Sequence, residues 1–283
     1  MAAVGSDHAP HHTIADSVSR RRESRLRAAV AKGEFEAFYE PILDVVSDRI
    51  VEVEAQLRWR DPDRGLLSPS GFMALAEDTG LIVPMGEQLL RHACTSLVDW
   101  RRAPGASALR VSATLSSVQL RERGFEQRVA AILEETGCPP WALTLEVTEN
   151  DTMVDGETIM ATLRALKGLG LRLVVDEFGV GHASLTFLRE APVDGIKIDR
   201  RFVSQVALEQ RDQAIVSSLL GMARGLGLDV MADGVETSEQ SQRLARLHCF
   251  EQQGRHFGEA LPAHDFTSLL GSRSGGPVSD VRA

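Results

Sequence analysis

The sequence alternates strand-like and helix-like segments along most of its length, and this alternation limits the folds that it can adopt. Short apolar runs such as ALTLEVTEN and LRLVVDEFG alternate with segments of helical spacing such as GETIMATLRALKGLG. Strand–helix units that repeat at intervals of about 30 residues are typical of right-handed parallel βαβ units. So many units in one chain of 283 residues favour an α/β fold of the TIM-like (β/α) barrel type over an open doubly wound sheet.

The first two strands depart from this alternation. FYEPILDVV and RIVEVEAQLRW are separated only by a turn at Ser47–Asp48, which predicts a pair of adjacent strands. No GxGxxG or GxxxxGK[ST] motif follows the first strand, which argues against a nucleotide-binding open sheet. The helices are expected to end at glycines, for example at Gly137 and Gly168.

The sequence predicts a single folded domain with a tail at each end. Residues 1–24 are polar and basic, and we expect a disordered tail that passes into the start of a basic helix. Residues 25–270 are expected to form the barrel. Residues 271–283, GSRSGGPVSDVRA, are rich in glycine and serine and are expected to be flexible.

Composition excludes several classes of function. A net charge of −9 provides no general basic field for nucleic acid or for an anionic membrane. No run of about 18 apolar residues is present, so we expect no membrane span. The three cysteines are odd in number and widely spaced, which favours a reducing cytoplasm over a disulfide framework.

Acidic residues recur where five of the predicted strands end. They are Glu54, Glu146, the pair Asp176 and Glu177, then Asp199 beside Lys197, and finally Asp233 with Glu236. In a parallel barrel these strand ends meet at one face, where barrel enzymes place their chemistry. Grouped carboxylates repel one another unless cations lie between them, and Mg²⁺ or Mn²⁺ prefers such oxygen ligands. A single acid at a strand end is more often only solvated, but five strands with the same feature favour a metal site.

Six ordered blocks of the sequence resemble the signature blocks of the EAL domain family. They are VEVEAQLRWRDPDRGLLSP, TLEVTEN, LVVDEFGVGHASL, GIKIDRRFV, MADGVET and QQGRHFGEALP. The family comprises bacterial phosphodiesterases that open cyclic di-GMP to linear pGpG with Mg²⁺ or Mn²⁺. The resemblance implies a TIM-like barrel that is usually dimeric, with its site at the carboxyl ends of the strands.

The resemblance also implies a role for each matching residue. The metal positions are Glu54, Thr114, Glu146, Asp176 and Glu177. The catalytic positions are Lys197, which orients or activates the attacking water, Asp233, which stands at the general-base position, and Glu236, a supporting acid. The substrate-binding positions are Arg58 for phosphate, Asp199 and Gln253.

Several of these positions depart from the family pattern. Thr114 stands where the family has a metal-binding asparagine, and a hydroxyl is a weaker ligand of Mg²⁺. Glu177 stands where the family has aspartate, and Asp233 where it has glutamate, so one carboxylate is longer and the other shorter by one methylene. A displacement of about 1 Å can reduce a rate on the order of 100-fold.

Two smaller departures complete the comparison with the family pattern. Gln56 replaces the leucine of the name-giving motif and needs a hydrogen-bond partner if it faces the helices. His182 and Ala183 change the loop GVGHASL, which follows the strand that ends at Asp176 and Glu177.

The sequence therefore supports a degenerate EAL protein of cyclic di-GMP signalling with weak or lost hydrolysis. Such a protein would act by binding cyclic di-GMP or by docking a protein partner, and the sequence does not separate these two. The alternative is an active, metal-dependent phosphodiesterase. We expect a cytoplasmic homodimer in either case.

Overall fold

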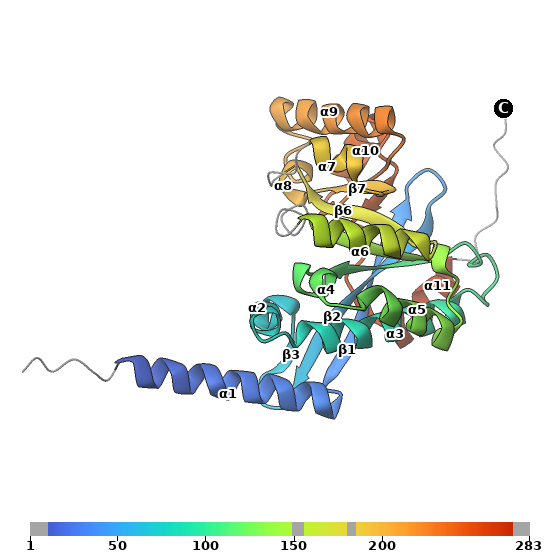
Figure 1. The fold of residues 1–283 in the computed structure, drawn as a ribbon. Helices are drawn as coiled ribbons and strands as arrows, with labels where there is room; N and C mark the ends of the chain where they lie inside the picture. Colours follow the sequence, from blue (N-terminus) through green and yellow to red (C-terminus); the bar gives the residue numbers. More distant parts are fainter. Residues whose placement is uncertain (1–10, 149–155, 180–184, 274–283) are drawn as a thin grey trace, which may run out of the picture.

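Eight strands close into a barrel in the computed structural model, which describes residues 11–148, 156–179 and 185–273 (Figure 1). The barrel strands are β1 (Phe35–Asp44), β2 (Arg49–Asp61), β4 (Arg110–Leu115), β5 (Leu143–Thr148), β6 (Arg172–Phe178), β7 (Gly195–Ile198), β8 (Asp229–Ala232) and β9 (Glu251–Gln253). Two short strands, β3 (Gly65–Leu67) and β10 (Leu261–Pro262), extend β2 and β1 at their edges. The predicted TIM-like barrel is confirmed.

Strand β1 is the exception to the parallel arrangement. It pairs antiparallel with β2 on one side and with β9 on the other, whereas the strands from β2 round to β9 pair in parallel. The predicted pair of strands around Ser47–Asp48 is therefore confirmed, but an all-parallel barrel is wrong for this strand. The short turn is the reason, because parallel neighbours need a crossover of a dozen or more residues.

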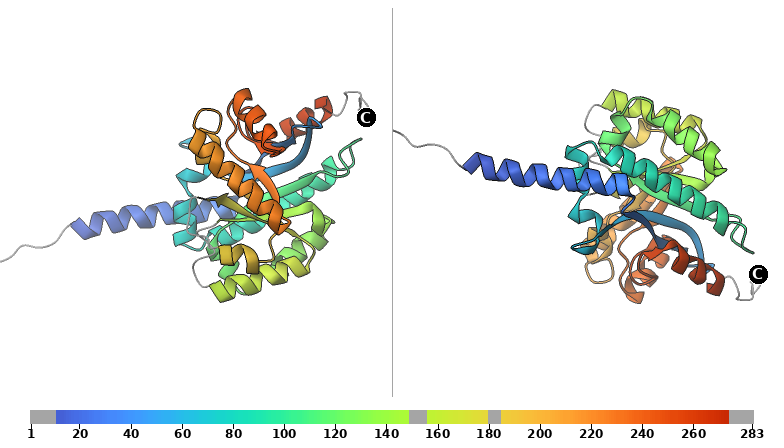
Figure 2. Two further views of the ribbon diagram at one scale, coloured as in Figure 1. Left: turned by 90° about the horizontal axis from the view of Figure 1, so that it is seen from above. Right: turned by 90° about the horizontal axis from the view of Figure 1, so that it is seen from below.

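Helices surround the barrel, as the views from above and below show (Figure 2). They are α1 (His11–Lys32), α2 (Met73–Asp78), α3 (Ile82–Trp100), α4 (Ser117–Arg121), α5 (Phe125–Thr136), α6 (Gly156–Gly168), α7 (Leu185–Glu190), α8 (Arg200–Val203), α9 (Gln210–Leu226), α10 (Ser238–Arg246) and α11 (Ala263–Arg273). Two 3₁₀ turns, η1 (Pro69–Gly71) and η2 (Pro140–Ala142), complete the elements. None of the described helices has both the length and the apolar composition needed to cross a membrane.

Local sequence signals set several of the helix ends. Helix α5 ends at Gly137, as predicted, with this glycine in the left-handed conformation. Helix α10 begins with a capping box, in which Thr237 and Gln240 each satisfy a backbone amide of the other. Such ends satisfy backbone groups that a helix would otherwise leave without partners.

The N-terminal part of the chain differs from the sequence prediction. Residues 11–24, expected to be disordered, belong to helix α1, which extends away from the barrel (Figure 1). Residues 1–10 and 274–283 lie outside the described residues. The helix contacts the barrel through its C-terminal half, where Leu26 and Ala29 are fully buried in the main core.

Gly254 shows how closely the backbone packs where the barrel closes. It directly follows β9 and has φ +140°, and a Cβ added there would lie 2.3 Å from the carbonyl oxygen of Val235. Backbone atoms cannot move aside as a flexible side chain can, so any side chain at this position displaces the end of β9. Gly254 therefore fixes the position of the preceding residue, Gln253.

We predict that Gly254→Ala lowers the free energy of unfolding by about 3 kcal/mol or more, since the new methyl group clashes with backbone. Gly221→Ala is the matched control, because this helical glycine in α9 has open space around an added Cβ. It should raise stability by up to about 1 kcal/mol, the difference in helix propensity. Urea unfolding of both variants measures the effect, and equal stability of the two variants would contradict it.

Candidate functional site

A buried lysine lies at the centre of the strand-end acids. Lys197 on β7 is 1% exposed, and its Nζ donates to Oε2 of Glu54 at 2.9 Å and to Oε2 of Glu146 at 3.1 Å. Glu54 comes from β2 and Glu146 from β5, so three separate strands supply this cluster. Burial alone would lower the pKa of Lys197, but the surrounding carboxylates raise it well above its usual value. Lys197 therefore remains a cation.

Glu54 has a second donor besides the lysine. Nε2 of Gln253, at the end of β9, donates to Oε2 of Glu54 at 2.6 Å. Burial acts to raise the pKa of Glu54, but Lys197 and the Gln253 hydrogen bond outweigh it, and the pKa falls below its usual value. Glu54 is therefore ionised, and the structure brings it into contact with Gln253.

The other acids of the cluster bind protons more tightly than usual. Burial, together with the charges of neighbouring carboxylates, raises the pKa of Glu146 to about 8 and that of Asp233 to about 6. The same causes raise the pKa of Asp176. At neutral pH, in the absence of a metal ion, the group is thus partly neutralised by protons as well as by Lys197.

Glu40 joins this cluster, and the sequence analysis missed it. It lies opposite Glu54 in the antiparallel pairing of β1 with β2. Burial, then the charges of Glu54 and Asp233, raises its pKa to about 7. Counting residues outward from the Ser47–Asp48 turn would place Glu40 opposite Val53. A register shift between Ile42 and Leu43 moves it by one residue and onto the face of Glu54.

Gln56 connects Glu40 to Arg58. Nε2 of Gln56 donates to Oε2 of Glu40 at 3.0 Å, and Nη2 of Arg58 donates to Oε1 of Gln56 at 2.9 Å. The guanidinium of Arg58 also lies over the ring of Phe38, 5.5 Å from its centroid. Because side chains alternate along a strand, Glu54, Gln56 and Arg58 share one face of β2. Gln56 thus faces the acids and finds its partners there.

Thr114 and Glu177 lie beside the buried acids. Thr114 is exposed at the end of β4, and its hydroxyl approaches Oε2 of Glu146 at 3.5 Å, the length of a weak hydrogen bond. Glu177 is exposed, has φ +52°, and its backbone amide donates to Oδ1 of Asp176 at 2.7 Å. A glutamate with positive φ is uncommon, and such backbone strain clusters at functional sites.

Asp199 and Glu236 take part in hydrogen bonds outside the Lys197 contacts. Asp199 is buried at the start of α8, where its Oδ1 accepts from the backbone amide of Arg201 at 2.8 Å. Glu236 is exposed, and its backbone amide donates to Gln240 at 2.7 Å. The loop residues His182 and Ala183 lie outside the described residues.

The donor atoms of the cluster suit a hard divalent cation. Among them are two buried oxygens that accept no hydrogen bond, Oε1 of Glu146 and Oε1 of Gln253. Within the described part of the chain, no three His, Cys, Asp or Glu side chains form a ready-made metal-binding group. Lys197 explains this, since its ammonium lies between the two glutamates. A divalent ion would have to share the carboxylates with Lys197.

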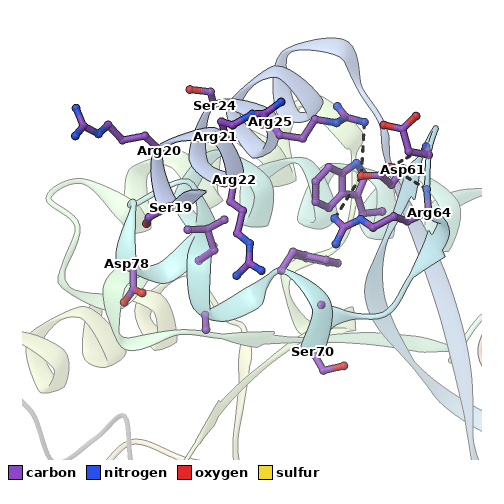
Figure 3. A pocket seen from close by; sticks show the side chains of 16 residues that line it. Ser19, Arg20, Arg21, Arg22, Ser24, Arg25, Asp61, Arg64, Ser70 and Asp78 are labelled. Atoms are coloured by element: carbon purple, nitrogen blue, oxygen red, sulfur yellow. Dashed lines mark hydrogen bonds and ion pairs between the residues drawn. The ribbon is translucent and has the colours of Figure 1, made fainter. Parts of the chain in front are cut away.

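A cavity lies elsewhere, between α1, the end of β2 and α2 (Figure 3). It has a volume of about 1320 Å³. At its edge the guanidinium groups of Arg25 and Arg64 each lie 5.3 Å from the ring centroid of Trp59, and both pair with the buried carboxylate of Asp61. These contacts attach α1 to the strand that carries Glu54.

Comparison with known proteins identifies related chains. The model of the family described as EAL domain matches residues 23–260. Cyclic di-GMP phosphodiesterase NbdA of Pseudomonas aeruginosa is 37% identical over 85% of this chain and 30% of its own length. The bifunctional diguanylate cyclase/cyclic di-GMP phosphodiesterase MucR of the same species is 36% identical over 87% of this chain and 36% of its own length. The chain therefore spans about a third of these relatives.

Solved structures agree with the sequence matches. The MucR phosphodiesterase in complex with c-di-GMP superposes with a TM-score of 0.82 at 35% identity, covering 87% of this chain and 99% of that one. The EAL enzyme Bd1971, bound to cAMP and cyclic di-GMP, superposes with a TM-score of 0.86 at 28% identity, covering 92% of this chain and 70% of that one.

We predict that Glu40→Gln makes the metal-free protein less sensitive to pH. The folded-state pKa of about 7 exceeds the usual value of 4.5, so the folded state holds a proton that the unfolded state has lost between these pH values. Wild-type stability should therefore fall as pH rises through this range. Relative to wild type, the variant should gain about 2 kcal/mol above pH 8 and little below pH 4.5.

Urea unfolding between pH 4 and pH 9 measures this dependence. Glu36→Gln is the matched control on the same strand, because Glu36 is partly exposed and pairs with Arg60. Its effect should stay within about 0.5 kcal/mol. A Glu40→Gln protein with the wild-type pH dependence would refute the prediction.

We also predict that Lys197→Met lowers the free energy of unfolding of the metal-free protein by about 3–5 kcal/mol at pH 8, because two buried glutamates lose their cation. The loss should be smaller at pH 5, where the carboxyls take up protons. Lys167→Met, which removes the more exposed partner of Asp194, is the control and should cost about 1 kcal/mol or less. Similar losses for both variants at pH 8 would count against a buried ion cluster.

Proposed function

Because the chain belongs to the EAL domain family, we propose that it is a cyclic di-GMP-binding regulator whose phosphodiesterase activity is weak or lost. The observation that carries the proposal is the cluster around Lys197. It retains the acids and the glutamine of the family pattern at Glu54, Glu146, Asp176 and Gln253, whereas Thr114, Glu177 and Asp233 depart from that pattern.

In this proposal Glu54, Glu146 and Asp176 hold Mg²⁺ or Mn²⁺ when the ion is bound, with Thr114 and Glu177 at the two further metal positions. The ion supplies Lewis-acid polarisation of the phosphodiester. Because the pKa of Glu146 is about 8, an ion must displace a proton from the site at neutral pH. Ion binding is therefore expected to be weak and to strengthen as pH rises.

The remaining groups bind and orient the dinucleotide and water. The guanidinium of Arg58, held by Gln56 and by the ring of Phe38, is preorganised to donate to a phosphate oxygen. Lys197 orients the attacking water, and Asp233 accepts its proton. Asp199 and Gln253 complete the substrate side, and Glu236 supports the loop that follows Asp233.

Three features support weak hydrolysis. The Thr114 hydroxyl lies against Glu146 instead of presenting an amide oxygen to an ion. Glu177 occupies a left-handed backbone position that aspartate tolerates better than glutamate. Asp233 has a pKa of about 6, suitable for a base, but its carboxylate is one methylene shorter than that of glutamate. Phosphate capture by Arg58 depends on none of these three residues.

The alternative is an active phosphodiesterase, which the retained Glu54, Glu146, Asp176 and Lys197 favour. A third candidate is a protein that docks a partner and needs no nucleotide. We further propose a cytoplasmic homodimer.

We predict that the wild-type protein binds cyclic di-GMP with micromolar or tighter affinity in isothermal titration with Ca²⁺, and releases little pGpG with Mn²⁺. Arg58→Ala should weaken binding by about 10-fold or more, since a charge-assisted phosphate contact is worth about 1.5–3 kcal/mol. Arg102→Ala is the control, because this arginine is 74% exposed and follows the C-terminus of α3, before β4 begins. No heat of binding would favour the partner-docking function.

We predict that Thr114→Asn, Glu177→Asp and Asp233→Glu together raise the rate of pGpG formation by about 100-fold, because they restore a metal ligand and the reach of the base. Chromatography of timed digests with Mg²⁺ and with Mn²⁺ measures the rate. Rapid hydrolysis by the wild-type protein, with no gain in the triple variant, would establish the active phosphodiesterase instead.

A further inference from the structure

Two hydroxyl groups lie in the barrel interior directly below the acids. Ser112 on β4 and Thr144 on β5 are opposite one another in the parallel pairing of these strands, and both are 0% exposed. Glu54 is the neighbour of Ser112 on the other side. Because alternate residues share a face, Thr144 lies on the same face of β5 as Glu146, two residues earlier. The two hydroxyls therefore lie in the layer of side chains next to that of Glu146, towards the amino ends of the strands.

Apolar residues would be expected at these positions. Barrel interiors are filled mainly by branched apolar side chains such as valine. The hydroxyls of Ser112 and Thr144 make no hydrogen bond with proper geometry in this structure. A buried hydroxyl without a partner costs about 1–3 kcal/mol, so two of them in one layer call for an acceptor close by.

A carboxylate oxygen of Glu146, two residues further along β5 than Thr144, is a possible acceptor. Oε2 of Glu146 receives Lys197 and Thr114, whereas Oε1 of the same carboxyl is buried and receives no donor. Two unmatched donors thus lie below one unmatched acceptor. Burial raises the pKa of Glu146. The Ser112 hydroxyl acts to lower this pKa, as a hydrogen-bond donor to the carboxylate would.

We propose that Ser112 and Thr144 are positioning residues for Glu146. Their hydroxyls donate to Oε1, directly or through one bound water, and so hold Oε2 towards Lys197 and towards a divalent cation. The inference rests on the proposed function in one respect only, that Glu146 helps to hold the ion. Residues that hydrogen-bond to a metal-binding carboxylate typically change metal affinity by about 10- to 100-fold when they are removed.

Thr144 offers a matched pair of variants. Thr144→Val keeps the shape and loses the hydroxyl, whereas Thr144→Ser keeps the hydroxyl and loses a methyl group. Isothermal titration with Mn²⁺ alone, without nucleotide, should show affinity reduced about 10-fold or more in Thr144→Val and in Ser112→Ala. Thr144→Ser should stay within about 3-fold of wild type. Thermal unfolding reports whether each variant is folded. If Ser112→Ala does not fold, the comparison of Thr144→Val with Thr144→Ser still tests the proposal.

The outcomes separate positioning from simple burial. If the hydroxyls are only unmatched buried groups, Thr144→Val will be as stable as wild type or more stable, with unchanged Mn²⁺ affinity, and the inference is wrong. It is also wrong if Thr144→Ser loses as much affinity as Thr144→Val, because packing would then be the cause. The positioning inference is also wrong if the wild-type protein binds no Mn²⁺. Titration with cyclic di-GMP in the absence of Mn²⁺ tests the proposed function separately.

Discussion

The contact of Lys197 with Glu54 and Glu146 is the interaction on which the arrangement of the site depends. A lysine that is 1% exposed is tolerated only because carboxylates on other strands surround it. The acids in turn depend on the cation, since burial and the closeness of the acids to one another raise the pKa of Glu40, Glu146 and Asp233. The cation and the acids therefore need one another, and removal of either leaves an unbalanced buried charge.

Barrel geometry makes this contact possible. Residues distant in sequence come together because parallel strands present their carboxyl ends at one face. The antiparallel β1 adds a residue that this rule does not supply. Its register shift turns Glu40 towards Glu54, and Gln56 then links Glu40 to Arg58. In this way the glutamine that departs from the family motif becomes part of the site.

The same arrangement relates the substituted residues to the proposed function. Thr114 and Glu177 lie beside the buried acids. Under the proposed function, a change of ligand at these two positions alters how an ion is held, and Asp233 keeps a carboxylate whose raised pKa suits a base. Under the same proposal, the site retains the charges needed to bind a phosphodiester and loses the precise placement needed to cleave it.

The sequence by itself determined the barrel, the pair of strands at its start, several helix ends and the set of strand-end acids, because these follow from local periodicity and from the direction of parallel strands. It did not determine that Glu40 joins the acids, since a single-residue register shift decides this and leaves no clear periodic signal. Nor did it predict that helix α1 begins as early as His11, or that Oε1 of Glu146 and the hydroxyls of Ser112 and Thr144 are buried without hydrogen-bond partners. Such features depend on packing between strands that are far apart in the sequence, which only the tertiary structure brings into contact.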